Sequence, residues 1–369
     1  MKALCPRDSL LSAFQLASAA ISTNREPVKP ILRNFKAIAD NGRFTLMATD
    51  LELGIRLDVM GLTIQDPGEA MLPFQKLHNV LREAREETLS IEADANACIV
   101  RGEDMEFELL SEDPAPFPDL PTFNEDKYHE ISADVLREMI KRTVFATAGE
   151  EGRYAMTGVL WELDGDAVKL VATDGKRLAL TEGKAKAHGG HSTKGQTPIV
   201  PSKAMTLLER NLAPDGQVVR VCLRPNEVLF RTELAVIYSR LVEGRFPDYR
   251  QVFPKKQPIR IPLSVDVFHA KVRQAAITAD EDSKKVTFRF GNDQLTLLSQ
   301  GARSGKSNVR MPITYDGKTV DINFNPAYLV DMLKILPEDA DLALDLVDGS
   351  TPALFRSGPS YSYLVMPLT

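Results

Sequence analysis

Hydrophobic and polar residues alternate along several segments of the chain, which is the pattern of half-buried β-strands. In residues 51–58 (LELGIRLD) every second residue is apolar, so one face of this predicted strand is buried. Residues 235–242 (AVIYSRLV) and 286–290 (VTFRF) are rich in β-branched and aromatic residues and are further predicted strands.

Six other segments repeat their apolar residues every three or four positions, which predicts amphipathic helices. In the first of them Leu10, Phe14 and Ala17 share one face, and Asp8 or Ser9 is a suitable N-cap. The predicted helices are residues 7–20, 73–87, 132–147, 201–212, 263–277 and 326–336. They fall in pairs, one pair in each third of the chain.

Two short motifs recur in the same order at similar spacing. ATDLELGI begins at Ala48 and ATDGKRLAL at Ala172, 124 residues later. FPDL begins at Phe117 and FPDY at Phe246, 129 residues later. One third of the 369 residues is 123, so a third copy is expected in the last third, with LLSQ at 297–300 in place of ATD. The predicted fold is α+β: three copies of a strand-rich unit, each with two helices.

Proline-rich polar segments separate the predicted copies. Residues 111–126 and 244–262 each contain four prolines, which suit extended linkers because proline fixes φ and lacks a ladder donor. We therefore predict domains at residues 1–125, 126–254 and 255–369.

The composition is that of a globular protein, with 43% hydrophobic and 26% charged residues and a net charge of −6. The sequence has no run of 18 apolar residues, and Arg7 and Asp8 interrupt any N-terminal signal peptide. Three separated cysteines without a CxxC pattern indicate a reducing cytoplasm rather than disulfides or zinc.

Candidate catalytic and metal motifs are incomplete. Residues 301–307 (GARSGKS) lack the first glycine of a P-loop and precede a predicted strand, so a basic hairpin loop is the better interpretation. The sequence HGGH at 188–191 lies in a Gly-, Lys- and Thr-rich stretch and is interpreted as a solvated loop rather than a metal site. We find no GxSxG or HExxH motif, and the sequence predicts no catalytic residue, metal or cofactor.

Basic residues recur on the polar faces of the predicted helices. They include Arg82 on 73–87, Arg137 and Lys141 on 132–147, and Lys203 and Arg210 on 201–212. Cationic faces on corresponding helices of an acidic protein indicate a shared surface for a polyanion. Such a surface would hold nucleic acid through few phosphate contacts.

Seven segments resemble, in order, the bacterial DNA polymerase sliding clamps, the beta subunits of DNA polymerase III. They are ATDLELGI (48–55), GRYAMTGVLWE (152–162), VATDGKRLAL (171–180), IVPSK (199–203), LVEGRFPDYRQVFP (241–254), FNPAYLVDML (324–333) and YLVMPLT (363–369). The resemblance spans the whole chain.

The resemblance implies a non-enzymatic processivity factor. It implies a head-to-tail homodimer whose six domains form a ring around double-stranded DNA, with helices lining the hole. It further implies work with a clamp loader, the catalytic subunit of DNA polymerase III, and other polymerases and repair proteins that carry clamp-binding peptides. A cytoplasmic, nucleoid-associated location is expected.

The family's partner-peptide pocket is carried over residue by residue. The positions implied are Met156, Thr173, Gly175, Lys176, Arg177, Leu178, Pro247, Gln251, Val252, Tyr328, Leu364, Met366 and Pro367. Preformed apolar surface and adaptable methionines suit a groove that is shared by many peptides.

DNA-facing and dimer positions are carried over in the same way. Arg25, Arg153, Tyr154 and Lys203 match DNA-facing positions, and Phe107, Leu109 and Ile277 match the edge strands that join two copies. Three features depart from the family pattern: Lys176 replaces a common His, Gln251 stands where some relatives have Arg, and segment 301–307 is basic where relatives are often acidic.

Two other functions remain open from the residues. A nucleotide-dependent enzyme would use segment 301–307, and its ATP hydrolysis would be lost on Lys306→Ala. A peptide-binding adaptor would use the pocket without contacting DNA.

Overall fold

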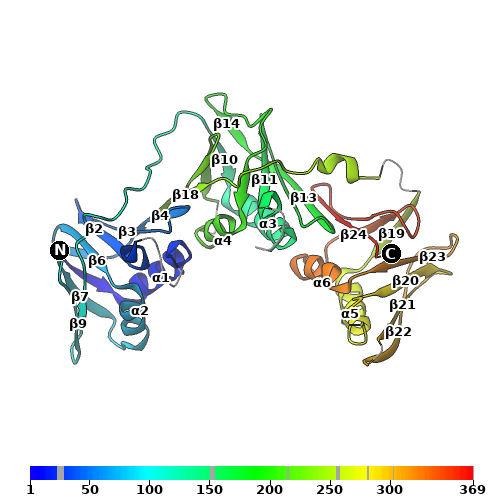
Figure 1. Ribbon diagram of the computed structural model, residues 1–369, viewed down its shortest axis with the longest axis horizontal. Coiled ribbons are helices and arrows are strands. Elements are labelled where there is room, and N and C mark those ends of the chain that lie inside the picture. Colours follow the sequence, from blue (N-terminus) through cyan, green and yellow to red (C-terminus); the bar gives the residue numbers. More distant parts are fainter. Residues whose placement is uncertain are drawn as a thin grey trace. The chain divides into compact units, whose positions relative to one another are not determined.

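The computed structural model describes residues 1–22, 29–149, 154–213, 216–254, 258–280, 282–301 and 303–368, with only the backbone of residue 154. Contacts divide the chain into two compact units. Unit 1 contains residues 1–136, 185–192 and 203–241, and unit 2 contains residues 137–184, 193–202 and 242–369. Each unit holds two antiparallel sheets with helices on them (Figure 1).

Unit 1 contains a five-stranded and a nine-stranded sheet. The first has the order β5 (Thr63–Asp66), β1 (Lys2–Pro6), β7 (Thr88–Ala93), β8 (Ala97–Arg101) and β9 (Glu106–Leu110). The second has the order β14 (Lys186–His188), β10 (Tyr128–Ser132), β16 (Val218–Leu223), β17 (Glu227–Arg231), β18 (Ala235–Arg240), β4 (Leu53–Val59), β3 (Arg43–Thr49), β2 (Phe35–Asp40) and β6 (Gly68–Leu72).

Unit 2 repeats this plan with an eight-stranded and a four-stranded sheet. The first has the order β15 (Ile199–Pro201), β11 (Gly158–Asp164), β12 (Ala167–Thr173), β13 (Arg177–Lys184), β26 (Tyr361–Val365), β25 (Ala353–Ser357), β24 (Leu342–Leu346) and β19 (Ile259–Leu263). The second has the order β22 (Gly305–Pro312), β21 (Gln294–Gly301), β20 (Val286–Gly291) and β23 (Val320–Phe324).

All six predicted helices are present. They are α1 (Arg7–Ala17), α2 (Phe74–Glu83), α3 (Ala133–Thr143), α4 (Ser202–Arg210), α5 (Val265–Ala276) and α6 (Pro326–Ile335). α1 packs on α2 and α5 packs on α6, and the apolar residues used in the prediction, such as Leu10 and Phe14, are fully buried. Short 3-10 turns (Ser18–Ala20 and Val144–Ala146) follow α1 and α3, where the periodic pattern runs beyond the α-helix.

The first copy of the ATD motif forms the tight turn between β3 and β4. The Thr49 hydroxyl donates to the Leu53 carbonyl at 2.8 Å, and the Asp50 carboxylate accepts from the Leu53 N–H at 2.8 Å. Leu51 has φ +80°, which is costly for a side chain other than glycine. The strand predicted from residue 51 therefore begins only at Leu53, because Leu51 belongs to the turn.

The third copy has a hairpin at the corresponding place. β21 contains the LLSQ segment and pairs with β22, with Gly301 opposite Gly305. Residues 301–307 thus close a β-hairpin, with residue 302 outside the described residues, and no helix begins there. The strand geometry agrees with the rejection of a P-loop.

The interpretation of HGGH as a solvated loop was wrong for its two histidines. His191 is buried, and its Nδ1 lies 2.7 Å from Nδ1 of the buried His129. His188 lies in β14 and pairs with Glu130 at 3.0 Å. The glycines between them form the turn, which allows both imidazoles to pack against β10.

All three cysteines lie in the interior of the fold. Cys5, Cys98 and Cys222 are all free and buried, and burial raises their pKa values to about 12, 12 and 11. In the described part of the chain no cluster of three His, Cys, Asp or Glu side chains could hold a metal ion. Within the same residues no helix is long and apolar enough to cross a membrane.

Candidate functional site

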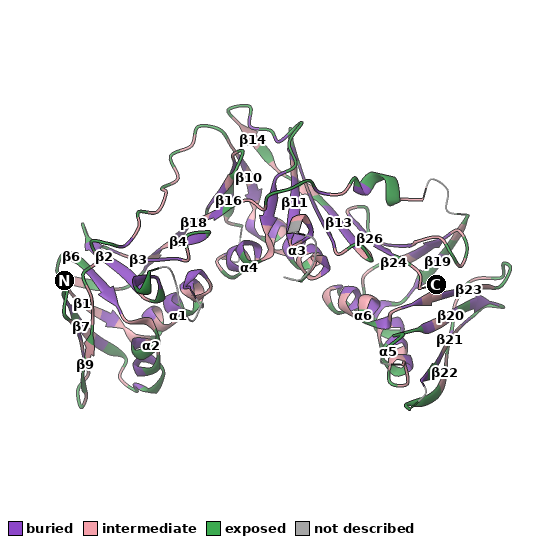
Figure 2. Ribbon diagram, viewed as in Figure 1, coloured by how far each residue is buried: buried purple, intermediate pink, exposed green. Residues whose placement is uncertain are grey.

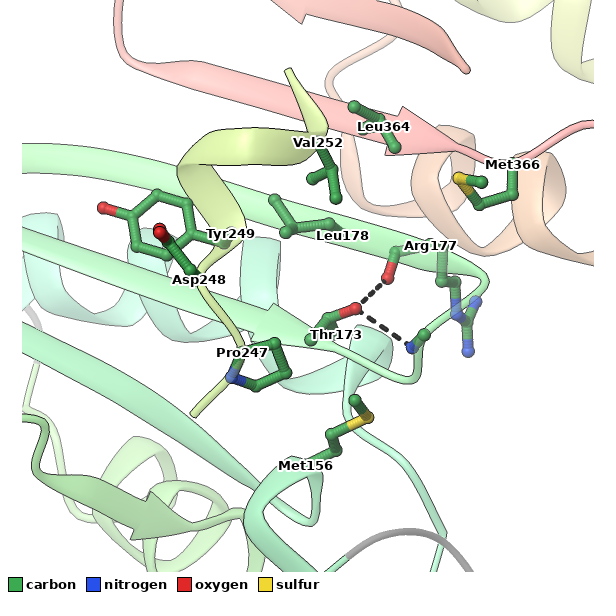
Figure 3. Close-up of a pocket in the computed structure, with 11 residues that line it drawn as sticks. Met156, Thr173, Arg177, Leu178, Pro247, Asp248, Tyr249, Val252, Leu364 and Met366 are labelled. Carbon is green, nitrogen blue, oxygen red and sulfur yellow. Dashed lines mark hydrogen bonds between the residues drawn. The ribbon is translucent and has the colours of Figure 1, made fainter. Parts of the chain in front are cut away.

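Unit 2 contains an apolar pocket with a volume of about 440 Å³ including its open mouth (Figure 3). Its lining comes from the β12–β13 turn, a 3-10 turn at Tyr249–Val252, and the segment around the end of β26. The lining residues are Met156, Thr173, Gly175, Arg177, Leu178, Pro247, Asp248, Tyr249, Val252, Leu364 and Met366.

The second ATD motif forms one wall of the pocket. The Thr173 hydroxyl donates to the Arg177 carbonyl at 2.6 Å and accepts from the Gly175 N–H at 3.0 Å (Figure 3). The Asp174 carboxylate accepts from the N–H groups of Lys176 and Arg177 at 2.9 and 3.0 Å. Gly175 has φ +86°, the conformation for which glycine is suited. This turn repeats the hydrogen bonds of the β3–β4 turn in unit 1.

The side chain of Arg177 anchors the β12–β13 turn to neighbouring elements. Its guanidinium donates to the Asp331 carboxylate at 2.5 Å and the Phe145 carbonyl at 2.7 Å, and lies 4.8 Å from the centre of the Tyr328 ring. Burial alone would lower the pKa of Arg177, but Tyr363 and Asp331 together raise it, so the residue stays charged. The charged side chain is thus held by hydrogen bonds to Asp174, Asp331 and the Phe145 carbonyl.

The strand β26, which pairs with β13 in the same sheet, extends this wall. Leu364 is buried and lies opposite Leu178 in the β13–β26 ladder. Beyond the strand, the Met366 N–H donates to the Lys176 carbonyl at 2.9 Å, so the chain stays attached to the β12–β13 turn. The Met366 side chain is 40% exposed at the mouth.

The 3-10 turn at Tyr249–Val252 completes the pocket. The buried Tyr249 donates to the Glu162 carboxylate at 2.9 Å, and burial followed by Glu162 raises the pKa of its hydroxyl. Gln251 donates to Asp248 at 2.8 Å. Val252 is 42% exposed and adds a second accessible apolar side chain.

The structure brings nine of the thirteen expected pocket residues together. The other four expected residues do not line the pocket themselves, but they neighbour lining residues in the sequence or contact them. They are Lys176, Gln251, Tyr328 and Pro367. Asp248 and Tyr249 line it and were not expected. Both belong to the repeated FPDY motif, which was the available signal for them.

The predicted cationic positions lie on helices in both units. In unit 1, Arg82 is on α2 beside Glu83, while the exposed Lys203 and Arg210 are on α4. Lys203 forms an ion pair with Asp50 of the β3–β4 turn at 2.5 Å. In unit 2, α3 carries the partly buried Arg137 and the exposed Lys141.

Three expected DNA-facing positions cannot be placed. Arg25 and Arg153 lie outside the described residues, and only the backbone of Tyr154 is described. The expectations for them therefore stay predictions.

The residues expected at a dimer interface are accessible. Phe107 and Leu109 lie on the edge strand β9, and Phe107 is 42% exposed. Ile277, just after α5, is 77% exposed. Large apolar side chains this accessible are candidates for contact with another protein surface.

Strand-rich units with a preformed apolar pocket are typical of a binding scaffold. The lining of the described pocket is mainly apolar and includes no nucleophile paired with a base.

Three family models match the chain in order. They describe the N-terminal, central and C-terminal domains of the DNA polymerase III beta subunit and match residues 1–126, 130–248 and 250–369. The chain therefore belongs to the DNA polymerase III beta subunit family, which is a family of non-catalytic processivity factors.

Relatives and solved structures agree over the full length. The chain is 28% identical to the beta sliding clamp of Escherichia coli K12, with 100% of both chains covered. It is 28% identical to the beta sliding clamp of Synechocystis, covering 100% of this chain and 99% of that one. The crystal structure of the DNA polymerase sliding clamp from Bacillus subtilis aligns with a TM-score of 0.91 and 25% identity over 100% of this chain and 99% of that one. That of the DNA polymerase III subunit beta from Pseudomonas aeruginosa aligns with a TM-score of 0.88 and 25% identity over 100% of both.

Proposed function

We propose that this protein is a DNA sliding clamp that gives polymerases processivity by encircling double-stranded DNA. In this proposal two copies assemble head to tail, each contributing three domains at residues 1–125, 126–254 and 255–369. The protein works in the cytoplasm, with the nucleoid, and catalyses no reaction itself.

The observation that carries the proposal is the pocket, in a chain that belongs to the beta subunit family. A preformed apolar pocket with two accessible side chains, Val252 and Met366, suits short peptides that present leucine or phenylalanine. The proposed occupants are segments of the DNA polymerase III catalytic subunit, of the clamp loader, and of other polymerases and repair proteins. Lys176, Gln251, Tyr328 and Pro367 are proposed as the rim and support of this site.

The proposed DNA surface consists of the cationic helix positions, with Arg25, Arg153 and Tyr154 added from the resemblance. A protein with net charge −6 and few basic contacts would bind DNA weakly through phosphates alone. Encirclement retains the protein on DNA without tight contacts, so that it can still slide.

The test is retention on DNA of different topology. The protein is loaded onto a nicked circular plasmid with its clamp loader and ATP, separated by gel filtration, and the plasmid is then cut once with a restriction enzyme. We expect the protein to remain on circles and to leave the linear product. Equal retention on both forms would overturn encirclement.

A paired variant tests the helix surface. Lys203→Ala with Arg210→Ala is expected to reduce loading, because two phosphate contacts are lost. Arg43→Ala with Lys186→Ala removes the same charge from exposed strand positions and is expected to load normally. Loading that is unchanged in the first variant would remove α4 from the proposed DNA surface.

A further inference from the structure

The segment that connects β9 with β10 runs extended along unit 1, without helix or strand (Figure 2). Residues 117–123 read FPDLPTF, so the apolar side chains of Phe117, Leu120 and Phe123 recur at every third position. A polyproline II chain has three residues per turn, and these three side chains therefore share one face. We call residues 117–125 the strap.

The first two apolar side chains of the strap pack on the nine-stranded sheet. Phe117 is buried in a cluster with Met47 of β3 and Met71 of β6. Leu120 lies so close to Gly54 of β4 that a Cβ on Gly54 would be 2.9 Å from the Leu120 Cδ2. Glycine at position 54 thus makes room for the Leu120 side chain.

The third apolar side chain packs further along the same sheet. Phe123 contacts an apolar cluster that includes Cys222 of β16 and Leu229 of β17. The strap ends at Glu125, whose carboxylate accepts from the Cys222 thiol at 3.6 Å and pairs with Arg224. The strap therefore crosses the junction of β4 with β18 and is held on both sides of it.

A straight row of paired residues lies beneath the strap. Gly54 pairs with Tyr238, Tyr238 with Leu229, and Leu229 with Cys222, across β4, β18, β17 and β16. Adjacent strands lie about 4.8 Å apart, and three residues of polyproline II advance about 9.3 Å, so successive apolar side chains reach every second strand. This spacing matches the positions of the second and third strap side chains.

The pocket in unit 2 lies on the corresponding row. Leu178 pairs with Leu364, and Leu364 pairs with Leu354, across β13, β26 and β25. Leu178 and Leu364 line the pocket. Leu178 follows the second ATD motif at the same distance as Gly54 follows the first, so the two rows are equivalent.

The chain takes different paths over the two rows. After FPDY it forms the 3-10 turn at Tyr249–Val252, and Val252 is 42% exposed at the pocket. After FPDL it stays extended, and Phe123, at the position equivalent to Val252, packs on the sheet. Unit 2 thus leaves its row open in a pocket, whereas unit 1 covers its row with the strap.

We propose that the row in unit 1 is a second peptide-binding site, and that the strap is its built-in occupant, which keeps the site closed to other peptides. The inference rests on the proposed peptide-binding role of the pocket in unit 2. Proline-rich segments bind aromatic-lined surfaces in the polyproline II conformation, and Tyr128 and Tyr238 supply aromatic rings beside Phe123. A tethered segment competes at an effective concentration of about millimolar, so a free peptide at micromolar concentration does not displace it.

The chemistry of the strap defines what the site accepts. The ligand is an extended peptide with apolar side chains at every third position and prolines between them. A synthetic peptide of residues 114–126 (PAPFPDLPTFNED) has this pattern and is the matched probe. With one open and one closed site, the wild-type protein is expected to bind one partner peptide per chain.

Removing the strap side chains in the full-length protein tests the proposal. The strap variant is Leu120→Ala with Phe123→Ala, and binding of the labelled probe is measured by fluorescence anisotropy. The variant is expected to bind the probe at least about tenfold more tightly than the wild type, because its own strap competes poorly. Thr122→Ala with Asn124→Ala changes two exposed residues of the same segment and is expected to behave like the wild type.

Cys222 reports directly on the site. It is 4% exposed in the cluster on which Phe123 packs, whereas Cys5 and Cys98 are buried in the five-stranded sheet. In the strap variant, N-ethylmaleimide is expected to label Cys222 at least about tenfold faster while Cys5 and Cys98 stay protected, as read by mass spectrometry. Excess probe is expected to slow this labelling again, because it covers the row.

Two results would overturn the proposal. Labelling of Cys222 that stays slow in the strap variant would mean that the strap does not close the site. Fast labelling that the probe does not slow would mean that the row binds no peptide. If the variant also exposes Cys5 and Cys98, it is unfolded, and the same measurements on Phe123→Ala alone decide between these results.

The readouts separate this inference from the proposed function. Cys222 belongs to unit 1, so its labelling depends neither on the pocket in unit 2 nor on DNA. Equal retention on circular and linear DNA would overturn the clamp and leave the Cys222 result unchanged. A Cys222 result that contradicts the strap would leave both the clamp and the pocket in unit 2 intact.

Discussion

Truncating the two accessible apolar side chains of the pocket should weaken peptide binding without destabilising the protein. The perturbation is Met366→Ala with Val252→Ala. Full burial of such a side chain is worth about 1.5–3 kcal/mol. Met366 and Val252 are 40% and 42% exposed, so a peptide that covers them gains roughly 0.6–1.2 kcal/mol from each. Losing both predicts a Kd roughly ten- to fifty-fold higher.

The assay is fluorescence anisotropy with a labelled short peptide that ends in leucine and phenylalanine. The matched control is Met60→Ala with Val218→Ala, because Met60 and Val218 are 64% and 49% exposed in unit 1 and do not line the pocket. The control is expected to bind like the wild type. Both double variants are expected to unfold within a few degrees of the wild type, since all four truncated side chains lie at the surface and are 40–64% exposed.

Two results would refute this reasoning. An unchanged Kd in the pocket variant would mean that the peptide does not cover Met366 and Val252. An equal loss in the control would mean that the effect comes from general surface hydrophobicity rather than from the pocket.

Three further predictions follow from single residues elsewhere in the fold. Arg177→Ala leaves Asp331 without its ion pair and should lower the free energy of unfolding by about 1–3 kcal/mol, measured by urea titration with Trp161 fluorescence. Arg177→Lys should restore only part of this free energy. Leu51→Gly relieves the strain of φ +80° at this residue and should raise the free energy of unfolding by about 0.5 kcal/mol, which is the strain of about 1–2 kcal/mol less the entropy cost of glycine. Leu51→Ala should give no gain, and thermal unfolding measures both variants. Burial lowers the pKa of His191 in the folded protein below 6.5, so the unfolded chain binds more protons than the folded one at mildly acidic pH. The free energy of unfolding should therefore be highest above pH 6.5 and fall as the pH drops below it. This loss should be smaller in His191→Asn. Stability that stays flat from neutral to mildly acidic pH would contradict the last of these.

The helices could be predicted, and the ATD motif could be recognised as a repeat, because their signals are local. The three- and four-residue periodicity located all six helices to within a few residues. The ATD motif encodes its turn through side chains that bond to the backbone two to four residues away, so two copies of the motif produce two matching turns. Leu51 was assigned to a strand because alternation alone does not reveal a positive φ.

The histidines and the strand edges could not be predicted because their partners are distant in sequence. His191 packs against His129, which is 62 residues away in the sequence. The glycines beside His191 indicate an exposed loop when only the local sequence is considered. The pocket combines residues from 156 to 366, and periodicity contains no information about which strands pair. Its positions came from the resemblance to a family rather than from the pattern, and their role in peptide binding stays a prediction.

The ladder between β4 and β18 has a consequence for how the protein is made. Residues 53–57 pair with residues 235–239, so the nine-stranded sheet of unit 1 cannot be completed until the chain has been synthesised as far as β18. Until then β4 is an open edge on a nascent polypeptide, where it can pair wrongly or recruit another chain. The N-terminal third should therefore remain dependent on chaperones during translation. Expressed alone, it should aggregate unless a peptide corresponding to β18 is supplied.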